Sequence, residues 1–203
     1  MPPKGERRKQ QIIDTAKKMF IEKGFQSTHI GQVCEELNIA RGTVYQYFSN
    51  KKEILYAILD TVVEDIEDML DPDDLQDFLV NHPEHEKMQI FIRDRLAGVM
   101  SVLVNEPIVI KLIFKEIYGI DTEVIERVNN VVMTIAKIIS VEVKELMSRK
   151  IYREGLDPKV TSSLLVGGVM MLVYEYDKKK LDVLDHSVIE KIAYNYLNGV
   201  LNK

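Results

Sequence analysis

The stretch ARGTVYQYFSNKKEIL, residues 40–55, holds a Gly-Thr step, three aromatic residues within four positions and a Lys-Lys pair. Val44 and Phe48 stand four positions apart and share one face of a helix, whereas Tyr45 and Tyr47 fall on the remaining faces. Exposed tyrosines on a short helix are unusual unless another surface packs against them. The stretch therefore predicts a helix over residues 41–48 that buries one apolar face and presents polar and aromatic side chains outward.

The positive charge of the chain gathers around this stretch. Residues 1–52 contain 10 Lys and Arg against 5 Asp and Glu, whereas residues 53–203 contain 17 against 27, and the whole chain of 203 residues carries a formal net charge of −5. Because local potential attracts phosphate, we expect any nucleic-acid binding in the first quarter of the chain.

Apolar residues recur with a helical period along nearly the whole sequence, and no convincing two-residue alternation marks a strand. We therefore predict an all-α protein. Before the opening stretch, the pattern gives helices over 7–23 and 30–37, the second capped by Thr28 and ended by Asn38, which tolerates a left-handed backbone. Two short helices joined by such a turn form a helix-turn-helix, which places its second helix in the major groove of DNA.

The outward side chains of the predicted second helix suit DNA. Arg41 can bond guanine, Gln46 can bond adenine, and the methyl group of Thr43 can contact thymine. The two tyrosine hydroxyls can reach phosphates beside the groove. Gly42 allows the start of the helix to approach the DNA backbone closely. A helical corner whose tyrosines only pack at a surface is the alternative, and the local charge argues against it.

The segment STHIGQVCEELNIARGTVYQYFSNKKEIL, residues 27–55, resembles the DNA-binding segment of TetR-type (tetracycline-repressor-like) transcriptional regulators. The shared pattern is a Thr before the second helix, a Lys/Arg-Gly-Thr-aliphatic-Tyr-x-His/Tyr-Phe run, and a Lys at the start of the fourth helix. Asn38 replaces the frequent turn glycine, and Ala40 replaces the usual Ser or Thr cap. The DNA contacts that the resemblance implies are Thr28, Arg41, Gly42, Thr43, Tyr45, Gln46, Tyr47 and Lys51.

The resemblance also implies an architecture and a function. A three-helix helix-turn-helix DNA-binding domain, residues 1–52, is expected to continue through a long helix, begun after Ser49 or Asn50, into a helical ligand-binding and dimerisation domain, residues 53–203. Such a regulator, acting as a repressor, binds a palindromic operator as a homodimer, and a small apolar or amphipathic effector releases it. A ligand-independent DNA-binding dimer is one alternative. An enzyme with an appended DNA-binding segment is another.

The last helix supports the dimer independently, because it pairs apolar residues every four positions from 188 to 201. A stripe of this width exceeds one packing partner, so we expect the helix to pack on its own core and on a second subunit. Small residues in the preceding helix would allow close approach. The residues expected at the dimer interface are Leu164, Gly168, Met171, Ile189, Ile192, Tyr196 and Leu197.

Aromatic and Met side chains beyond residue 88 could line an effector pocket, although ordinary core packing explains most of them equally well. Arg95 is more specific, because it falls on the apolar stripe of Met88, Ile92 and Val99, where a charge needs a partner. That partner could be Glu116 or an anionic ligand head, or the side chain could reach the surface. The candidate ligand residues are Phe91, Arg95, Met100, Phe114, Tyr118, Met133, Tyr152, Met170 and Tyr174.

No further site emerges from the sequence. The segment HPEHE, residues 82–86, matches no zinc spacing, and Cys34, the single cysteine, fits a small buried apolar group better than a redox sensor. Four scattered histidines and one cysteine supply no nucleophile and base for catalysis. With no signal-peptide or membrane-spanning pattern, we expect a cytoplasmic protein that is not an enzyme and needs no cofactor.

Overall fold

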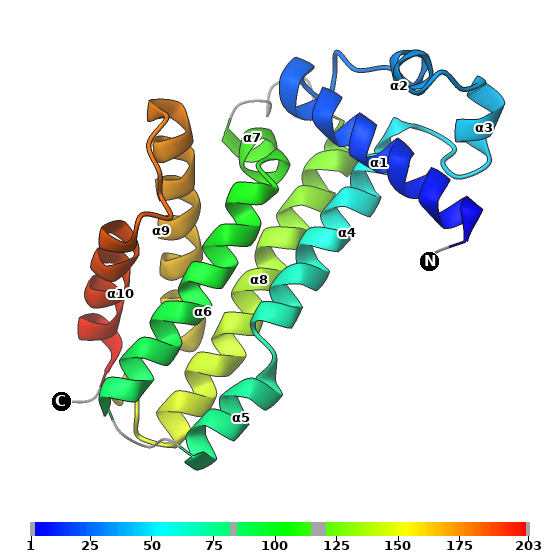
Figure 1. Cartoon of the computed structure of the whole chain (residues 1–203). Coiled ribbons are helices and arrows are strands. Elements are labelled where there is room, and N and C mark those ends of the chain that lie inside the picture. The colour runs from blue at the N-terminus through cyan, green and yellow to red at the C-terminus, as the bar shows by residue number, and fades with distance from the viewer. Residues whose placement is uncertain (1–2, 82–84, 115–120, 202–203) are drawn as a thin grey trace. The chain divides into compact units, whose positions relative to one another are not determined.

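The computed structural model describes residues 3–81, 85–114 and 121–201, and in these ranges the chain forms ten helices (Figure 1). The all-α prediction is confirmed, since the described residues contain no strand beyond one isolated bridge between Tyr152 and Leu201. The helices are α1 (Lys4–Lys23), α2 (Ile30–Leu37), α3 (Arg41–Tyr45), α4 (Lys51–Met69), α5 (Pro72–Asn81), α6 (His85–Asn105), α7 (Ile108–Phe114), α8 (Thr122–Ser148), α9 (Pro158–Lys179) and α10 (His186–Val200).

The helices form two compact units. Unit 1 comprises Met1–Val62 and Pro107–Asn129, and unit 2 comprises Val63–Glu106 and Asn130–Lys203. Both α4 and α8 contribute residues to each unit. The functional boundary between residues 52 and 53 stays a prediction, because the compact units follow packing and not the order of the sequence.

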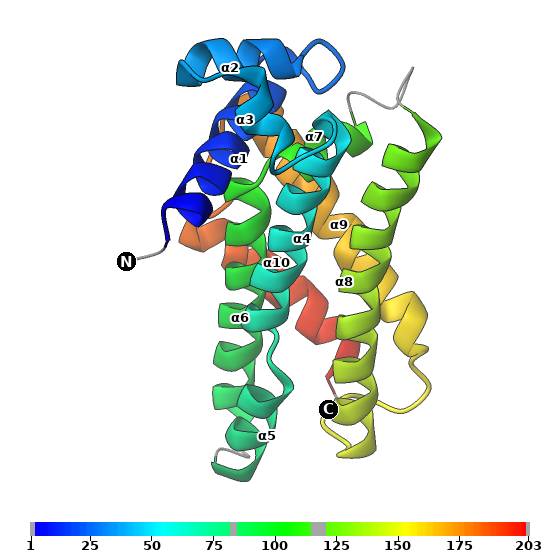
Figure 2. The ribbon, with the colours of Figure 1, turned by 90° about the vertical axis from the view of Figure 1, so that its right-hand side faces the viewer.

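Unit 1 is built on α1, which packs against α2 and α7 (Figure 2). Helix α1 begins at Lys4, three residues before the predicted start, and its apolar face buries Ile12 and Phe20 almost completely. Gly24 ends it with a positive φ of 88°, which favours glycine. The ammonium of Lys111 in α7 donates to the carbonyl of Ile21 at 2.9 Å, and so satisfies a carbonyl at the end of α1.

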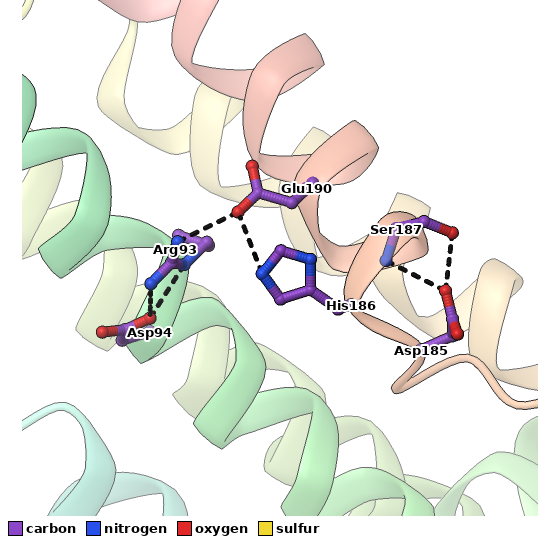
Figure 3. Close-up of polar contacts among 6 residues, drawn as sticks. All are labelled: Arg93, Asp94, Asp185, His186, Ser187 and Glu190. Atoms are coloured by element: carbon purple, nitrogen blue, oxygen red, sulfur yellow. Dashed lines mark hydrogen bonds and ion pairs between the residues drawn. The ribbon is translucent and has the colours of Figure 1, made fainter.

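Unit 2 is organised by α6, which packs against both α9 and α10. The guanidinium of Arg93 in α6 donates to Glu190 in α10 at 2.9 Å, and His186 lies 3.6 Å from the same carboxylate (Figure 3). Asp185 caps α10 by accepting the N–H of Ser187 at 2.9 Å. The ion pair between Arg93 and Glu190 joins the first turns of α10 to α6, and the rest of α10 packs through its apolar residues.

Among the described residues, no single helix is long and apolar enough to cross a membrane. Within the described ranges, Lys87–Asn105 and Ile108–Phe114 meet the required length and composition only when they are taken together.

Candidate DNA-binding surface and ligand cavity

The helix-turn-helix consists of α2, the turn over residues 38–40, and α3. Asn38 ends α2 in the left-handed conformation, with φ 50°, as predicted. Helix α2 starts after His29, whose N–H donates to the side chain of Gln32 at 2.8 Å. The prediction that Thr28 caps α2 is wrong, because the Thr28 hydroxyl is buried and donates to the carbonyl of Gly24 at 2.8 Å.

Helix α3 is shorter than the predicted span of 41–48. Regular helix ends at Tyr45, and the N–H groups of Tyr47 and Phe48 both donate to the carbonyl of Val44, at 2.9 and 3.0 Å. This convergence tightens the last turn, as is common at helix ends. Gln46 and Tyr47 therefore lie in the turn that joins α3 to α4. Asn50 caps α4, since its side chain accepts the N–H groups of Lys52 and Glu53.

The faces of α3 agree with the pattern read from the sequence. Val44 and Phe48 are 0% and 4% exposed, whereas Tyr45 is 54% exposed. A Cβ atom at Gly42 would meet nothing within 4 Å, so the start of α3 is open to an approaching surface. Of the remaining predicted contacts, Arg41 and Gln46 are exposed, and Thr43 and Tyr47 are half-buried.

Arg41 has a contact that the sequence did not predict. A Cβ atom placed on Gly31 of α2 would lie 2.9 Å from a guanidinium nitrogen of Arg41, closer than real Cβ contacts allow. Glycine at position 31 therefore makes room for the Arg41 side chain to lie against α2. The guanidinium end of Arg41 therefore lies close to α2, while the residue as a whole stays exposed.

Lys51 is held by backbone carbonyls. Its ammonium donates to the carbonyls of Phe25, Gln26 and Thr28 at 2.8, 2.9 and 3.0 Å, and it lies 4.7 Å from the centre of the Phe25 ring. An ammonium has three N–H donors, and these three carbonyls accept all of them. The contact of Lys51 with phosphate stays a prediction, and the geometry favours a role in fixing the turn between α1 and α2 to the start of α4.

Lys52, the next residue, links α4 to the start of α8 within unit 1. Its ammonium lies 2.8 Å from a carboxylate oxygen of Asp121 and 2.8 Å from one of Glu123. The hydrogen bonds from Lys52 lower the pKa of both carboxyl groups and raise the pKa of Lys52. Asp121 also caps α8 by accepting the N–H of Glu123 at 2.9 Å.

Unit 2 contains a small, mainly apolar cavity of about 60 Å³. Helices α6, α8, α9 and α10 contribute its walls, together with Leu70 and Tyr152. Its polar groups are Arg95, Glu142, Tyr152 and Tyr196. The two tyrosine rings meet edge to face with centroids 6.2 Å apart, and burial raises the pKa of Tyr196 to about 12 and that of Tyr152 well above its usual value. Both phenols are therefore neutral near pH 7.

The partner of Arg95 is Glu142 in α8. One guanidinium nitrogen lies 3.2 Å from the carboxylate, and the two side chains are 9% and 14% exposed. The expected alternative, Glu116, lies outside the described residues. Glu142 was missed, although it falls on the stripe of Ile135, Ile139 and Leu146 and breaks that stripe as Arg95 breaks its own. The rule that selected Arg95 would have found it.

The structure brings only some of the predicted ligand residues together. Arg95, Tyr152 and Met170 line the cavity. Met100 is fully buried elsewhere in the core, and Met133 is 67% exposed. The cavity is not lined by Phe91, Phe114 or Tyr174. The Phe91 ring stacks on the Phe78 ring with centroids 4.2 Å apart, and the Arg95 guanidinium lies over the Phe91 ring. Tyr118 lies outside the described residues.

The predicted interface residues fall into two groups. Leu164, Gly168 and Met171 are exposed along α9. On α10, Ile189, Ile192 and Tyr196 are half-buried, and Leu197 is buried at 4% exposure. These residues therefore pack into the core of their own chain more than the exposed α9 residues do. Tyr196 lines the cavity described above.

Among the described residues, no group of His, Cys, Asp and Glu could hold a metal ion. Residues 82–84 of the HPEHE segment lie outside the described residues. Cys34 is a buried free thiol at 5% exposure, packed in α2.

Comparisons with known proteins agree with this geometry. Residues 12–58 match the model of the family described as bacterial regulatory proteins, tetR family. The chain is 22% identical to the fatty acid metabolism regulator protein of Bacillus subtilis over 201 residues, which is 95% of each chain. It is 40% identical to the HTH-type transcriptional regulator HbdR of an Aromatoleum species over 62 residues, which cover 30% of this chain and 27% of HbdR.

A solved structure of similar fold is the transcriptional regulator FadR from Bacillus subtilis in complex with stearoyl-CoA. It superposes with a TM-score of 0.74 at 19% identity, over 94% of this chain and 98% of that one. Residues 12–58, which carry the exposed Arg41 and Tyr45, therefore match the tetR family of bacterial regulatory proteins, and the chain shares the all-α fold of the solved FadR structure.

Proposed function

We propose that the protein is a homodimeric repressor that binds a palindromic operator through α3 and the turn after it, and that a small effector bound in unit 2 releases the DNA. The observation that carries the proposal is the outward face of α3. Tyr45 is 54% exposed there, beside Arg41 and Gln46, in a segment of net charge +5. An exposed tyrosine beside exposed Arg and Gln side chains, in a positively charged segment, is typical of a surface that binds DNA.

DNA contacts divide by chemistry. Arg41 and Gln46 would hydrogen-bond base edges and so set sequence preference. The hydroxyl groups of Tyr45 and Tyr47 would contact phosphates, and the methyl group of Thr43 would contact the thymine methyl group. These contacts would position the helix in the groove. The open space above Gly42 would admit the DNA backbone. Thr28 would contribute through its position beneath this surface, since its hydroxyl is already bonded within unit 1.

A second subunit would cover α9. Val160, Leu164 and Met171 are 56%, 72% and 46% exposed, and Gly167 and Gly168 lie between the last two. An exposed apolar stripe with small residues at its centre suits close packing of helices from two copies. A groove between α9 and α10, lined by Leu164, Leu172 and Ile192, continues this surface. The dimer would hold two copies of α3 about 34–36 Å apart, one turn of DNA.

The effector would bind in the cavity of unit 2. A space of about 60 Å³ is far below the 300–1,000 Å³ of a typical ligand pocket, so binding must open it. The ligand would be apolar or amphipathic, because the walls are apolar apart from four polar side chains. Two similar solved structures, FadR with stearoyl-CoA and SmeT with triclosan, carry ligands of this character. Release requires that the effector bind the open state better than the DNA-bound state.

The experiment combines operator selection with effector screening. Sequences selected from a random duplex library should be palindromic, and Arg41→Ala should weaken binding to them, whereas Lys144→Ala, which removes an exposed charge from α8, should not. Apolar acids, alcohols and thioesters should then be screened for loss of operator affinity. If no compound changes that affinity, the small cavity would favour a ligand-independent DNA-binding dimer. The proposal places this activity in the cytoplasm and involves no catalysis.

A further inference from the structure

The ion pair between Arg95 and Glu142 stands on the wall of an otherwise apolar cavity. Both side chains line the space, they are 9% and 14% exposed, and their charged atoms lie 3.2 Å apart. Burying two charges costs more than one such contact returns unless further hydrogen bonds satisfy them. Further hydrogen bonds to one or both side chains are therefore needed to offset the cost of burying the pair.

Arg95 has unused bonding capacity. Its Nε atom is buried without a hydrogen-bond partner among the described residues. Two other guanidinium nitrogens share the carbonyl of Asp71 at 3.4 Å, near the upper limit for a hydrogen bond, and the Phe91 ring covers one face at 5.1 Å. A nine-tenths buried guanidinium with an unsatisfied donor, beside an apolar space, has the capacity to bond one further acceptor group.

The charges of the groups around Glu142 determine the protonation state of the site when an acceptor group binds there. Among the described residues that line the cavity, Arg95 from α6 is the one cation. Tyr152 and Tyr196 are neutral, α9 presents only apolar side chains, and Leu70 adds no charge. Burial also raises the pKa of Glu142, and the nearby Arg95 opposes this shift. A second carboxylate here would place two negative charges on one guanidinium, a state that paired carboxyl groups avoid by retaining a proton.

Building on the proposed function, we propose that the effector is an amphipathic carboxylic acid, that its carboxylate binds Arg95, and that Glu142 takes up one proton when it binds. The apolar tail occupies the cavity between α6, α8 and α9. The proton comes from solvent and resides on the Glu142 carboxyl group, so charge balances with one cation and one anion in the complex. Affinity for the acid consequently depends on pH, whereas affinity for a neutral ligand of the same length does not.

Titration calorimetry of the full chain with decanoate tests this inference, with 1-decanol as the neutral probe and decanoyl-CoA as the thioester probe. Titrations in phosphate and Tris buffers, which differ in ionisation enthalpy, count the protons. We expect close to one proton taken up per site at pH 8. We also expect decanoate affinity to fall about tenfold per pH unit wherever Glu142 is ionised in the free protein.

Substitutions at Glu142 and Arg95 test which side chain takes up the proton. Glu142→Gln should abolish proton uptake, flatten the pH dependence and tighten decanoate binding at pH 8 at least tenfold, because the competing carboxylate is gone. Glu145→Gln, the matched control on the same helix outside the cavity, should behave as the wild type. Because Arg95→Gln leaves Glu142 buried alone and could prevent folding, the double variant Arg95→Gln/Glu142→Gln is also needed. It should fold, bind 1-decanol and lose its preference for decanoate.

The outcomes separate the two proposals. This inference would be overturned if decanoate and 1-decanol bound equally well without proton uptake. It would also be overturned if decanoyl-CoA bound more tightly than decanoate without proton uptake. Either result would still be compatible with an effector-controlled regulator. Proton uptake that persists in Glu142→Gln would also overturn this inference. If none of the probes binds or weakens operator affinity, both this inference and the proposed effector control fail, whereas selection of a palindromic operator would still support DNA binding.

Discussion

Replacing Lys51 by Met should destabilise unit 1 and leave the salt dependence of DNA binding unchanged. The substitution keeps an unbranched apolar side chain and removes the ammonium that joins three carbonyls, at 2.8, 2.9 and 3.0 Å, to the start of α4. Hydrogen bonds to a charged group contribute roughly 1.5–3 kcal/mol each, and the freed carbonyls recover part of this from water. We therefore expect a net loss of about 2–3 kcal/mol.

That loss corresponds to a fall in Tm of roughly 4–12 °C for a chain of this size. Thermal denaturation followed by circular dichroism measures it, and Lys18→Met, which removes an exposed charge from α1, serves as the control. Operator titrations at several salt concentrations complete the test. Affinity should fall at every salt concentration, because fewer molecules hold α3 in its binding position.

A phosphate contact would give the opposite pattern. Loss of one such contact lowers the slope of log K against log salt by about one and leaves the fold intact. If Lys51→Met had an unchanged Tm and a slope reduced by one, the positioning role inferred from the three carbonyls would be refuted.

Three further predictions follow from particular contacts. Arg41→Ala should reduce discrimination between the selected operator and single-base variants by about 1–3 kcal/mol at the position it reads, measured by competition binding; a uniform loss across all variants would instead indicate a phosphate contact. Leu164→Asp should sediment as a folded monomer because this side chain is 72% exposed in one chain, whereas Leu197→Asp, at 4% exposure, should unfold; a stable Leu164→Asp dimer would move the interface elsewhere. Lys52 lowers the pKa of Asp121 in the folded chain, so its stabilisation is present above the usual carboxyl pKa near 4 and is lost as pH falls below it; Tm measured from pH 6 to pH 3 should therefore drop more steeply in wild type than in Lys52→Met, and parallel curves would contradict this.

The sequence by itself determined the features that depend on neighbours within a few residues. The left-handed Asn38, a cap at Ser49 or Asn50, of which the structure selects Asn50, and the alternation of buried Val44 with exposed Tyr45 all follow from backbone preference and helical period. For this reason the all-α class and the helix-turn-helix were predictable, and the family resemblance could be recognised from one short run.

Only the tertiary structure decided which distant groups meet. Lys51 reaches carbonyls 23 to 26 positions earlier, and Arg95 meets Glu142 47 positions later. Periodicity assigns a residue to a face of its own helix but does not say which face of another helix lies opposite, so Met133 was expected in a pocket and is 67% exposed. Chemical complementarity across the packed core, and not local preference, selects those pairs, because a buried charge or donor is stable only where some other segment supplies its partner.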